Sequence, residues 1–284
     1  MKRVWSIILM MLLPLIMMAM AAQADEKEWS FGVINQRSLT LTARYWNPIL
    51  KYVSEKSGIP LTLKMAKNAP ESFEMVRQGA FDFMYSNYVF APPNVTVGYR
   101  VFARPMDRTI RGEIVTLADS PIRSLKDLEG KEVGFPSRVA FVAYGVTWDA
   151  LLKAGITVKP VFSGNQEGTM GQLKAGRVIA AGVNSRVMKE FARREKLRYR
   201  VLWASREYLG IPLSAHPRVP GQTVEAVRRA FTAMAEDPEG LKILKSSAAL
   251  IGQEPPFGFV PATDREYESQ RSFYRTTVLK EFIR

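Results

Sequence analysis

Four short loops carry the side chains best suited to binding a small anion, and each follows an apolar run typical of a β-strand. They are Asn35-Gln36-Arg37-Ser38, Ser86-Asn87-Tyr88, Pro136-Ser137-Arg138 and Asn184-Ser185-Arg186. Hydroxyl, amide and guanidinium groups donate hydrogen bonds, and a guanidinium can pair with an oxyanion through two of them. With one tyrosine added, the predicted ligand-binding residues are Gln36, Arg37, Ser38, Ser86, Asn87, Tyr88, Ser137, Arg138, Tyr144, Asn184 and Ser185.

These loops have a second explanation, because Ser and Asn also cap helices and form turns in any protein. Each loop taken singly is explained well by capping. The case for a ligand depends on convergence, since loops at the carboxyl ends of the strands of an open α/β sheet meet at one crevice. Helices that begin there present unpaired N–H groups and partial positive charge, which suits a carboxylate or phosphonate-like anion.

Aromatic residues near the same loops are candidates for the walls of a pocket. They are Tyr45, Trp46, Tyr88, Tyr144 and Trp148. Three of them, Tyr45, Tyr144 and Trp148, also fall at the helical spacing of a buried core stripe, so both interpretations stay open for those three. Tyr88 is the best pocket candidate of the five.

Signatures of catalysis are scarce in the sequence. His216 is the only histidine, and no serine nucleophile elbow accompanies it. Gly164, Gly168 and Gly171 miss the spacing of a dinucleotide-binding loop. No group of histidines and carboxylates has the spacing of metal ligands. We therefore predict that the protein is not an enzyme and has no metal and no cofactor.

A basic stretch, Phe191 to Arg200 (FARREKLRYR), is the one feature that could suggest a nucleic-acid partner. A helix end with favourable cations that runs into a strand explains it more simply. We expect no nucleic-acid partner.

Two β-α series would position the four loops. The first reads as strand 29–34, helix 40–57, strand 61–65, helix 70–78 and strand 81–85. The second reads as strand 131–135, helix 139–154, strand 158–162, helix 166–174, strand 178–183 and helix 184–195. Such spacing favours parallel sheets covered by helices. The predicted fold is α/β, with two Rossmann-like lobes, 25–110 with 205–284 and 111–204, joined by a two-segment hinge.

The N-terminus predicts the compartment. Lys2 and Arg3 precede an apolar run from Ile7 to Met20, and small residues at Ala22 and Ala24 fit a signal-peptidase site. The run is shorter than the roughly 20 residues of a membrane-spanning helix. We expect residues 1–24 to be a cleaved signal peptide and the protein to lie in the periplasm.

Charge and cysteine content narrow the class of partner. The chain has 284 residues, no cysteine and a net charge of +13, from 40 basic and 27 acidic residues. The absence of cysteine excludes disulfides and thiolate ligands. The basic surplus favours anionic partners without choosing among small ligands, nucleic acid and membrane surfaces.

Several motifs together resemble a known family. They are FGVINQRS from Phe31, RQGAFDFMYSN from Arg77, DSPIRSLKDLEGKEVGF from Asp119, LLKAGI from Leu151, GNQEGTMGQLKAGRVIAAGVNS from Gly164, REYLGIPLSAHPRVP from Arg206 and EDPEGLKIL from Glu236. The chain resembles the periplasmic substrate-binding components of ABC transporters for phosphonate, phosphite and phosphate, which are type II periplasmic binding proteins. The resemblance implies a protein that closes two lobes around a small anion and delivers it to an ABC permease. A ligand-sensing partner of a membrane receptor or histidine kinase is the alternative.

The chain departs from that family at the loop after the KEVGF strand. The family's phosphonate binders carry a Ser-Thr-Ser-Gly-type segment there, and the matching positions hold Ala140, Phe141, Val142 and Ala143. Another departure is at Val178-Ile179, where an acidic residue is usual. Two ligand classes therefore remain: a phosphonate or phosphate held by Arg37, Ser137 or Arg138 in place of the lost hydroxyls, and an organic anion suited to the more apolar surface.

Overall fold

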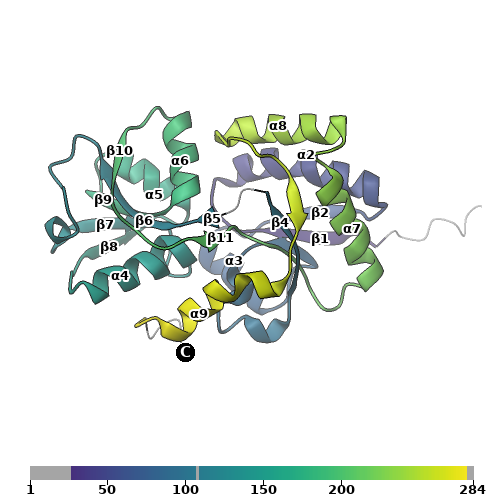
Figure 1. The fold of residues 1–284 in the computed structure, drawn as a ribbon, viewed down its shortest axis with the longest axis horizontal. Helices are drawn as coiled ribbons and strands as arrows, with labels where there is room; N and C mark the ends of the chain where they lie inside the picture. Colours follow the sequence, from purple (N-terminus) through teal and green to yellow (C-terminus); the bar gives the residue numbers. More distant parts are fainter. Residues whose placement is uncertain (1–26, 107–108, 280–284) are drawn as a thin grey trace, which may run out of the picture.

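The computed structural model describes residues 27–106 and 109–279. Two α/β lobes lie side by side, each built on its own β-sheet (Figure 1). The predicted signal peptide, residues 1–24, lies outside the described residues. Among those that are described, no helix has the length and apolar character needed to cross a membrane.

The first lobe has a six-stranded sheet formed by two distant parts of the chain. In spatial order its strands are β13 (Phe259–Pro261), β4 (Arg100–Pro105), β12 (Leu213–Ala215), β3 (Phe83–Tyr85), β1 (Trp29–Val33) and β2 (Leu61–Lys64). Strands β1, β2 and β3 are parallel, and β12 runs antiparallel to both β3 and β4. The carboxyl ends of β1 and β3 therefore carry two of the predicted loops to the same edge of this sheet.

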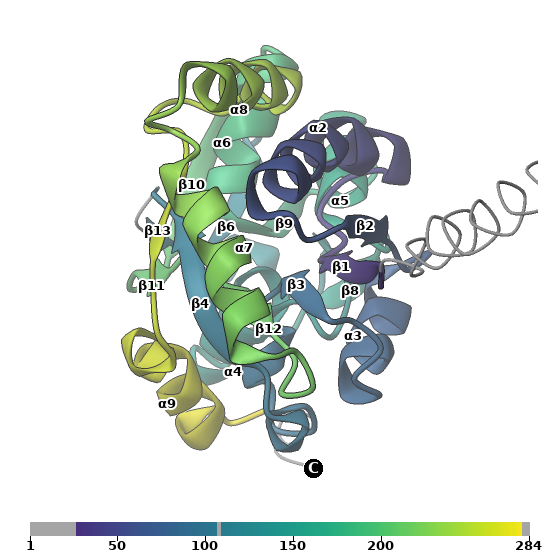
Figure 2. The same cartoon turned by 90° about the vertical axis from the view of Figure 1, so that its right-hand side faces the viewer.

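Helices cover this sheet and start at the residues that can cap them. They are α2 (Leu39–Ser57), α3 (Ala69–Arg77), α7 (Gly221–Ala233), α8 (Pro238–Ile251) and α9 (Glu268–Thr276), with short 3-10 turns η1 (Tyr88–Phe90), η2 (Val95–Val97) and η5 (Asp264–Tyr267). Helix α2 follows Ser38, whose Oγ accepts a hydrogen bond from the amide of Leu41 at 3.3 Å, and it ends at Gly58 with φ of 69°. Figure 2 shows α7 lying over β4, with α2 and α8 side by side above.

The second lobe has a five-stranded sheet from one continuous part of the chain. Its strands, in spatial order, are β10 (Tyr199–Ala204), β6 (Gly112–Leu117), β9 (Ala180–Asn184), β7 (Glu132–Phe135) and β8 (Lys159–Phe162). Its helices are α4 (Thr147–Lys153), α5 (Gln166–Lys174) and α6 (Ser185–Arg194), with the 3-10 turn η3 (Lys126–Leu128). Strands β7, β8 and β9 are parallel, as the β-α rhythm predicts.

Two chain segments cross between the lobes and pair with each other. The short strands β5 (Thr109–Ile110) and β11 (Tyr208–Leu209) form an antiparallel ladder between the two sheets (Figure 1). Arg111 separates the hinge strand β5 from the sheet strand β6, which begins at Gly112. Paired crossing strands of this kind are a common hinge for lobe closure.

The helix predicted over 139–154 begins differently from an ordinary α-helix. Its first turns, Phe141–Val146 (η4), are a π-helix, in which the amide of Gly145 bonds to the carbonyl of Ala140 at 2.9 Å. This turn lies directly on the sheet, because a Cβ added at Gly112 would lie 2.4 Å from the carbonyl oxygen of Val142. The wider turn and the glycine beneath it set where the loop after β7 meets the first lobe.

Glu113, beside the hinge on β6, provides a pH-dependent test of the fold. Burial raises the pKa of this carboxyl, while Arg111 lowers it, and Oε2 is buried with no hydrogen-bond partner among the described residues. A raised pKa in the folded protein means that stability is lost as the pH rises above the unfolded value. Glu113→Gln should therefore increase the free energy of unfolding at pH 7 by less than about 1 kcal/mol, allowing for solvent screening.

Urea denaturation of the wild type and Glu113→Gln between pH 3 and pH 8 measures this effect. The two curves should converge at acid pH, where the glutamate is protonated in both the folded and unfolded protein. A variant less stable than the wild type at pH 7 would contradict the assignment.

Candidate ligand-binding site

A small cavity lies between the lobes at the carboxyl ends of both sets of parallel strands. We call it the inter-lobe cavity; its lining residues are Ile34, Asn35, Gln36, Ala69, Asn87, Tyr88, Pro136, Ser137, Ala140, Phe141, Val142, Gln166, Asn184 and Ile211. Its free volume is about 20 Å³, which is room for about one water molecule. No Asp, Glu, His, Lys or Arg is among these residues.

The first lobe contributes amide and aromatic side chains to the cavity. Asn35 and Gln36 follow β1, and Gln36 accepts a hydrogen bond through its backbone carbonyl from the amide of Glu167 in the other lobe at 3.1 Å. Asn87 and Tyr88 follow β3, where Ser86 Oγ accepts from the Tyr88 amide at 3.1 Å. Burial raises the pKa of Tyr88, so this phenol stays protonated and can donate.

The second lobe contributes the loop after β7 and the loop after β9. Ser137 is buried, and η4 starts four residues later with amides that lack partners in the preceding turn. Asn184 caps α6, because its Oδ1 accepts from the amides of Arg186 and Val187 at 3.0 and 3.4 Å. Its own amide donates to Gln166 Oε1 at 3.2 Å. These two loops thus bring helix starts to the cavity.

Three buried oxygen atoms of the cavity residues lack hydrogen-bond partners within the described chain. They are Asn35 Oδ1, Asn87 Oδ1 and Ser137 Oγ, and they come from both lobes. An unpaired buried polar group is costly, so such atoms in a native protein usually meet water or a ligand. Their gathering at one cavity is the clearest sign of a binding site in the described chain.

Phe141 links this cavity to the hinge. Its ring lies 5.0 Å from that of Tyr208 on β11, and 5.4 and 5.5 Å from those of Phe273 and Tyr274 on α9. The side chain is 3% exposed. The residue that stands where the family's phosphonate binders carry a hydroxyl is therefore an anchor between the second lobe, the hinge and the last helix.

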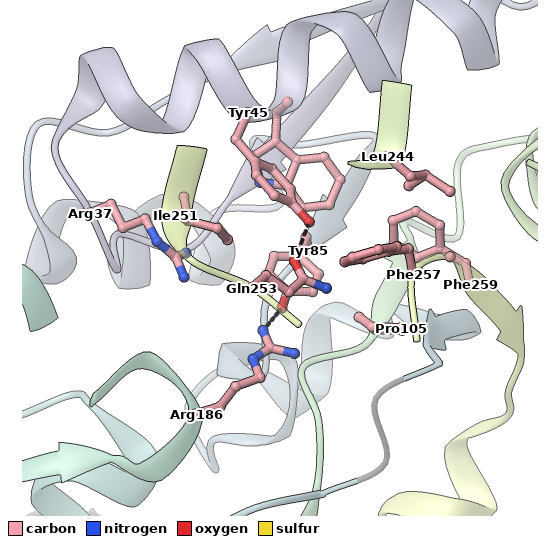
Figure 3. A pocket seen from close by; sticks show the side chains of 12 residues that line it. Arg37, Tyr45, Tyr85, Pro105, Arg186, Leu244, Ile251, Gln253, Phe257 and Phe259 are labelled. Carbon is pink, nitrogen blue, oxygen red and sulfur yellow. Dashed lines mark hydrogen bonds between the residues drawn. The ribbon is translucent and has the colours of Figure 1, made fainter. Parts of the chain in front are cut away.

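A second pocket lies beside the cavity, and Figure 3 shows it at close range. We call it the arginine–tyrosine pocket; its lining residues are Arg37, Tyr45, Trp46, Tyr85, Pro105, Arg186, Leu244, Ile251, Gln253, Phe257, Gly258 and Phe259. Its free volume is also about 20 Å³. Tyr45 donates to Gln253 Oε1 at 3.1 Å, and Arg186 Nη2 donates to the hydroxyl of Tyr85 at 3.0 Å.

Charged contacts in this pocket join the two lobes. Arg37, after β1, forms an ion pair with Glu190 on α6, and their side chains are 11% and 5% exposed. Glu190 Oε1 also lies 3.6 Å from Arg186 Nε. Burial works to lower the pKa of Arg186, but Tyr85 and Glu190 outweigh it and the pKa is raised. Arg186 therefore remains charged, and the two arginines hold the lobes together through Glu190 and Tyr85.

The predicted site residues separate into three groups. Gln36, Asn87, Tyr88, Ser137 and Asn184 line the inter-lobe cavity, and Arg37 lines the arginine–tyrosine pocket.

The third group lines neither space, and each member has a structural contact. Ser38 caps α2, and Ser86 accepts from the amide of Tyr88. Ser185 Oγ accepts from the amide of Arg111 at 2.9 Å. Arg138 donates to the hydroxyl of Tyr144 at 3.2 Å. For Ser38 and Ser86, the alternative explanation by local capping or turn formation describes the observed contact, whereas Ser185 contacts a residue 74 positions away.

Sequence reasoning missed Asn35, Gln166 and Tyr85, which line these two spaces, and Glu190, which pairs with Arg37. Asn35 stands beside Gln36 in a loop already singled out, and Gln166 begins a predicted helix. Glu190 lies four residues after Arg186, which is the spacing of an ion pair on one helix face. Tyr85 is predicted only as the last residue of a strand. The hydrophobic periodicity of the sequence predicts helices and strands, but it does not predict which side chains of the two lobes will contact each other.

Comparison with known proteins gives one family and several similar folds. Residues 31–267 match the family described as "ABC transporter, phosphonate, periplasmic substrate-binding protein". No curated protein matches the chain.

Among solved structures, the fold is similar to that of a binding-protein component of a phosphonate ABC transporter from Pseudomonas aeruginosa. The two share 18% identity and a TM-score of 0.74, over 87% of this chain and 85% of that one. PhnD1 from Prochlorococcus marinus, solved with methylphosphonate, shares 15% identity and a TM-score of 0.73, over 88% and 98% of the chains. A Xanthomonas citri protein bound to ATP shares 15% identity and a TM-score of 0.65, over 87% and 96%.

These likenesses confirm the predicted two-lobed fold of the type II periplasmic binding proteins. The family match covers most of the chain, from within β1 to the end of η5. The chain therefore belongs to the family of periplasmic substrate-binding proteins of phosphonate ABC transporters.

Proposed function

We propose that this protein binds a small phosphonate-type oxyanion in the inter-lobe cavity and delivers it to an ABC permease. The observation that carries the proposal is that buried Asn87 Oδ1 and Ser137 Oγ, from opposite lobes, line one cavity at the start of a helix. An anion there would meet helix amides, a hydroxyl and an amide that can turn to donate. Membership of the solute-binding family supports the transport role.

Opening of the lobes is part of this function. Because the cavity has room for about one water molecule, the lobes must lie farther apart than in this structure both to admit and to hold a tetrahedral anion. We propose that lobe 1 (25–110 and 205–284) and lobe 2 (111–204) move about the β5–β11 ladder. Closure then buries the ligand, and the permease receives the closed form.

The proposed location follows from the same role. We propose that residues 1–24 are removed on export and that the mature protein, from Asp25, works in the periplasm. The class of protein argues against catalysis, since its members bind and deliver a solute without changing it.

Isothermal titration calorimetry of residues 25–284 tests the proposal. Methylphosphonate, phosphite and phosphate are the oxyanion probes, and benzoate represents the organic anions. We expect one-to-one binding of at least one phosphorus oxyanion. Ser137→Ala should weaken that binding about tenfold, because one hydrogen bond to a charged ligand is lost.

Ser38→Ala is the matched control, since this serine caps α2 and lies outside the cavity. Its effect on the dissociation constant should be small. Binding of benzoate with no response to any phosphorus oxyanion would contradict the proposed ligand and favour an organic anion.

A further inference from the structure

We propose that Asn35 makes the site selective for a protonated anion: its Oδ1 accepts a hydrogen bond from a P–OH group, and fully ionised sulfate is excluded. This inference depends on the proposed function and adds to it a specificity residue and a charge state of the ligand. It concerns a residue outside the loop that differs from the phosphonate binders.

The orientation of the Asn35 amide is fixed by the chain. Nδ2 donates to the backbone carbonyl of Ala66 at 2.9 Å, and the whole residue is 9% exposed. Turning the amide over would place two oxygens against each other, so the hydrogen bond identifies which atom is the oxygen. Oδ1 is therefore an acceptor only. It is buried and has no hydrogen-bond partner in the described residues.

Asn87, on the neighbouring loop, differs in this respect. Its Oδ1 is also buried and unpartnered, but no side-chain hydrogen bond from residues 27–106 or 109–279 holds its amide in one orientation. Asn87 can turn to donate to a ligand oxygen, whereas Asn35 cannot. The cavity thus combines adaptable donors with one fixed acceptor.

No side chain that lines the cavity can take the ligand's acidic proton. Aspartate, glutamate, histidine, lysine and arginine are all missing from the lining, and burial raises the pKa of the tyrosine, Tyr88. A proton that meets a fixed carbonyl oxygen then stays on the ligand. Helix starts compensate the ligand's remaining negative charge.

Charged side chains on the adjoining elements lie outside the cavity, and several of them are paired. Arg138, beside Ser137, donates to the hydroxyl of Tyr144 at 3.2 Å. Arg37 and Arg186 contact Glu190, Glu167 contacts Arg194 at 2.7 Å, and the carboxylate of Glu71, on α3, accepts from the amide of Lys67. None of these side chains lines the inter-lobe cavity. If any of these groups titrated and affected binding, the affinity of a ligand analogue with no proton to lose would also change with pH.

The chemistry of the ligands makes the selectivity measurable. Phosphonate and phosphate keep one acidic proton near neutral pH, whereas sulfate has only acceptor oxygens. If sulfate occupied the cavity, one of its oxygens would face Asn35 Oδ1, and neither atom could donate a hydrogen bond. This unpaired buried acceptor should make sulfate bind about 10- to 100-fold more weakly than a protonated oxyanion.

The test measures dissociation constants by calorimetry from pH 5.5 to pH 8.5 for three probes: methylphosphonate, sulfate and the monomethyl ester of methylphosphonate. We expect methylphosphonate to bind at least tenfold more tightly than sulfate at pH 6. Its affinity should fall about tenfold per pH unit once the pH exceeds the ligand's second pKa, since only the protonated form binds. The ester anion has no P–OH group and no proton to lose in this range, so it should bind about as weakly as sulfate, with an affinity that does not change with pH.

Two variants separate selectivity from folding. Asn35→Leu removes the acceptor, and the preference for methylphosphonate over sulfate should shrink to less than about threefold. Asn94→Leu is the matched control: Asn94 is also buried, donates to a backbone carbonyl at 3.0 Å and has an unpartnered Oδ1, but it does not line the cavity. Its selectivity should match the wild type. If Asn35→Leu fails to fold, Asn35→Asp, which keeps an acceptor, should still reject sulfate.

The outcomes distinguish this inference from the proposed function. Methylphosphonate binding with equal sulfate affinity, or with affinity that rises with pH, would overturn the role of Asn35 and leave phosphonate binding intact. A pH profile for the ester that matches that of methylphosphonate would also overturn it. If no phosphorus oxyanion bound, the proposed function would fail, and this inference with it.

Discussion

Replacing Phe141 with alanine should lower the free energy of unfolding by about 3–5 kcal/mol, the usual cost of removing a buried aromatic side chain. The ring is 3% exposed and contacts Tyr208, Phe273 and Tyr274. Its removal would leave a cavity where the second lobe, the hinge and α9 meet. Chemical denaturation followed by tryptophan fluorescence measures the change.

Leu152→Ala is the control for Phe141→Ala. Leu152 lies on α4, the continuation of the same helical segment, and is 44% exposed. A surface substitution of this kind should change stability by about 0.5 kcal/mol or less. A cost below about 1 kcal/mol for Phe141→Ala would show that the aromatic contacts do not anchor the lobe.

Removing the carboxylate of Glu190 should open the lobes. Glu190→Ala leaves the guanidinium of Arg37 buried without its ion-pair partner, and breaking a buried pair costs about 3–5 kcal/mol. Separation of the lobes rehydrates Arg37, so part of this cost should appear as a shift from the closed to the open form. The chain has no cysteine, so cysteines introduced at exposed Lys51 and Lys153 would be unique sites for spin labels.

The distance between the two spin labels should be longer in Glu190→Ala than in the wild type. Glu254→Ala is the matched control, because Glu254 also pairs across the lobes, with Lys189 at 3.4 Å and Arg193 at 2.5 Å, but is 54% exposed. Exposed ion pairs contribute about 1 kcal/mol or less. Equal opening in both variants would contradict the special role of the buried pair.

The parallel strands and the helices between them could be predicted from the sequence, because the β-α periodicity and the caps are local signals. The antiparallel strands β12 and β13 could not, since each is three residues long and pairs with strands distant in the sequence. Helix α2 begins after Ser38 and ends at Gly58, as its cap and its Gly-Ile-Pro stop indicate. The π-helical start at Phe141 could not be predicted in this way. It depends on close packing over Gly112 and Gly182, which lie on strands distant in the sequence.

The site could be predicted only at the level of loops. The four predicted loops do reach the space between the lobes, with Gln36, Asn87, Ser137 and Asn184 lining the cavity. The backbone dihedral angles of single loop residues decide which side chain faces the cavity, and sequence patterns do not report them. In the loop after β1, Asn35 lines the cavity, whereas Ser38 caps α2. Contacts between the lobes, such as Arg37 with Glu190, join residues 153 positions apart and carry no local signal.

The departure at Ala140–Ala143 takes on a different meaning once the fold is known. The sequence indicates lost hydroxyls at an anion site, and the structure shows that Phe141 contributes packing at the hinge while Ser137 supplies a buried hydroxyl to the cavity. Main-chain amides at a helix start do not depend on side-chain type. An oxyanion site can therefore persist where the hydroxyls have been replaced.

The most direct test of the account is a crystal structure of residues 25–284 with methylphosphonate. The account predicts that the phosphorus lies in the inter-lobe cavity, within hydrogen-bond reach of Ser137 Oγ and the amides that begin η4, with one ligand oxygen at Asn35 Oδ1. Methylphosphonate ordered in the arginine–tyrosine pocket, beside Arg186 and Tyr85, would contradict the central claim.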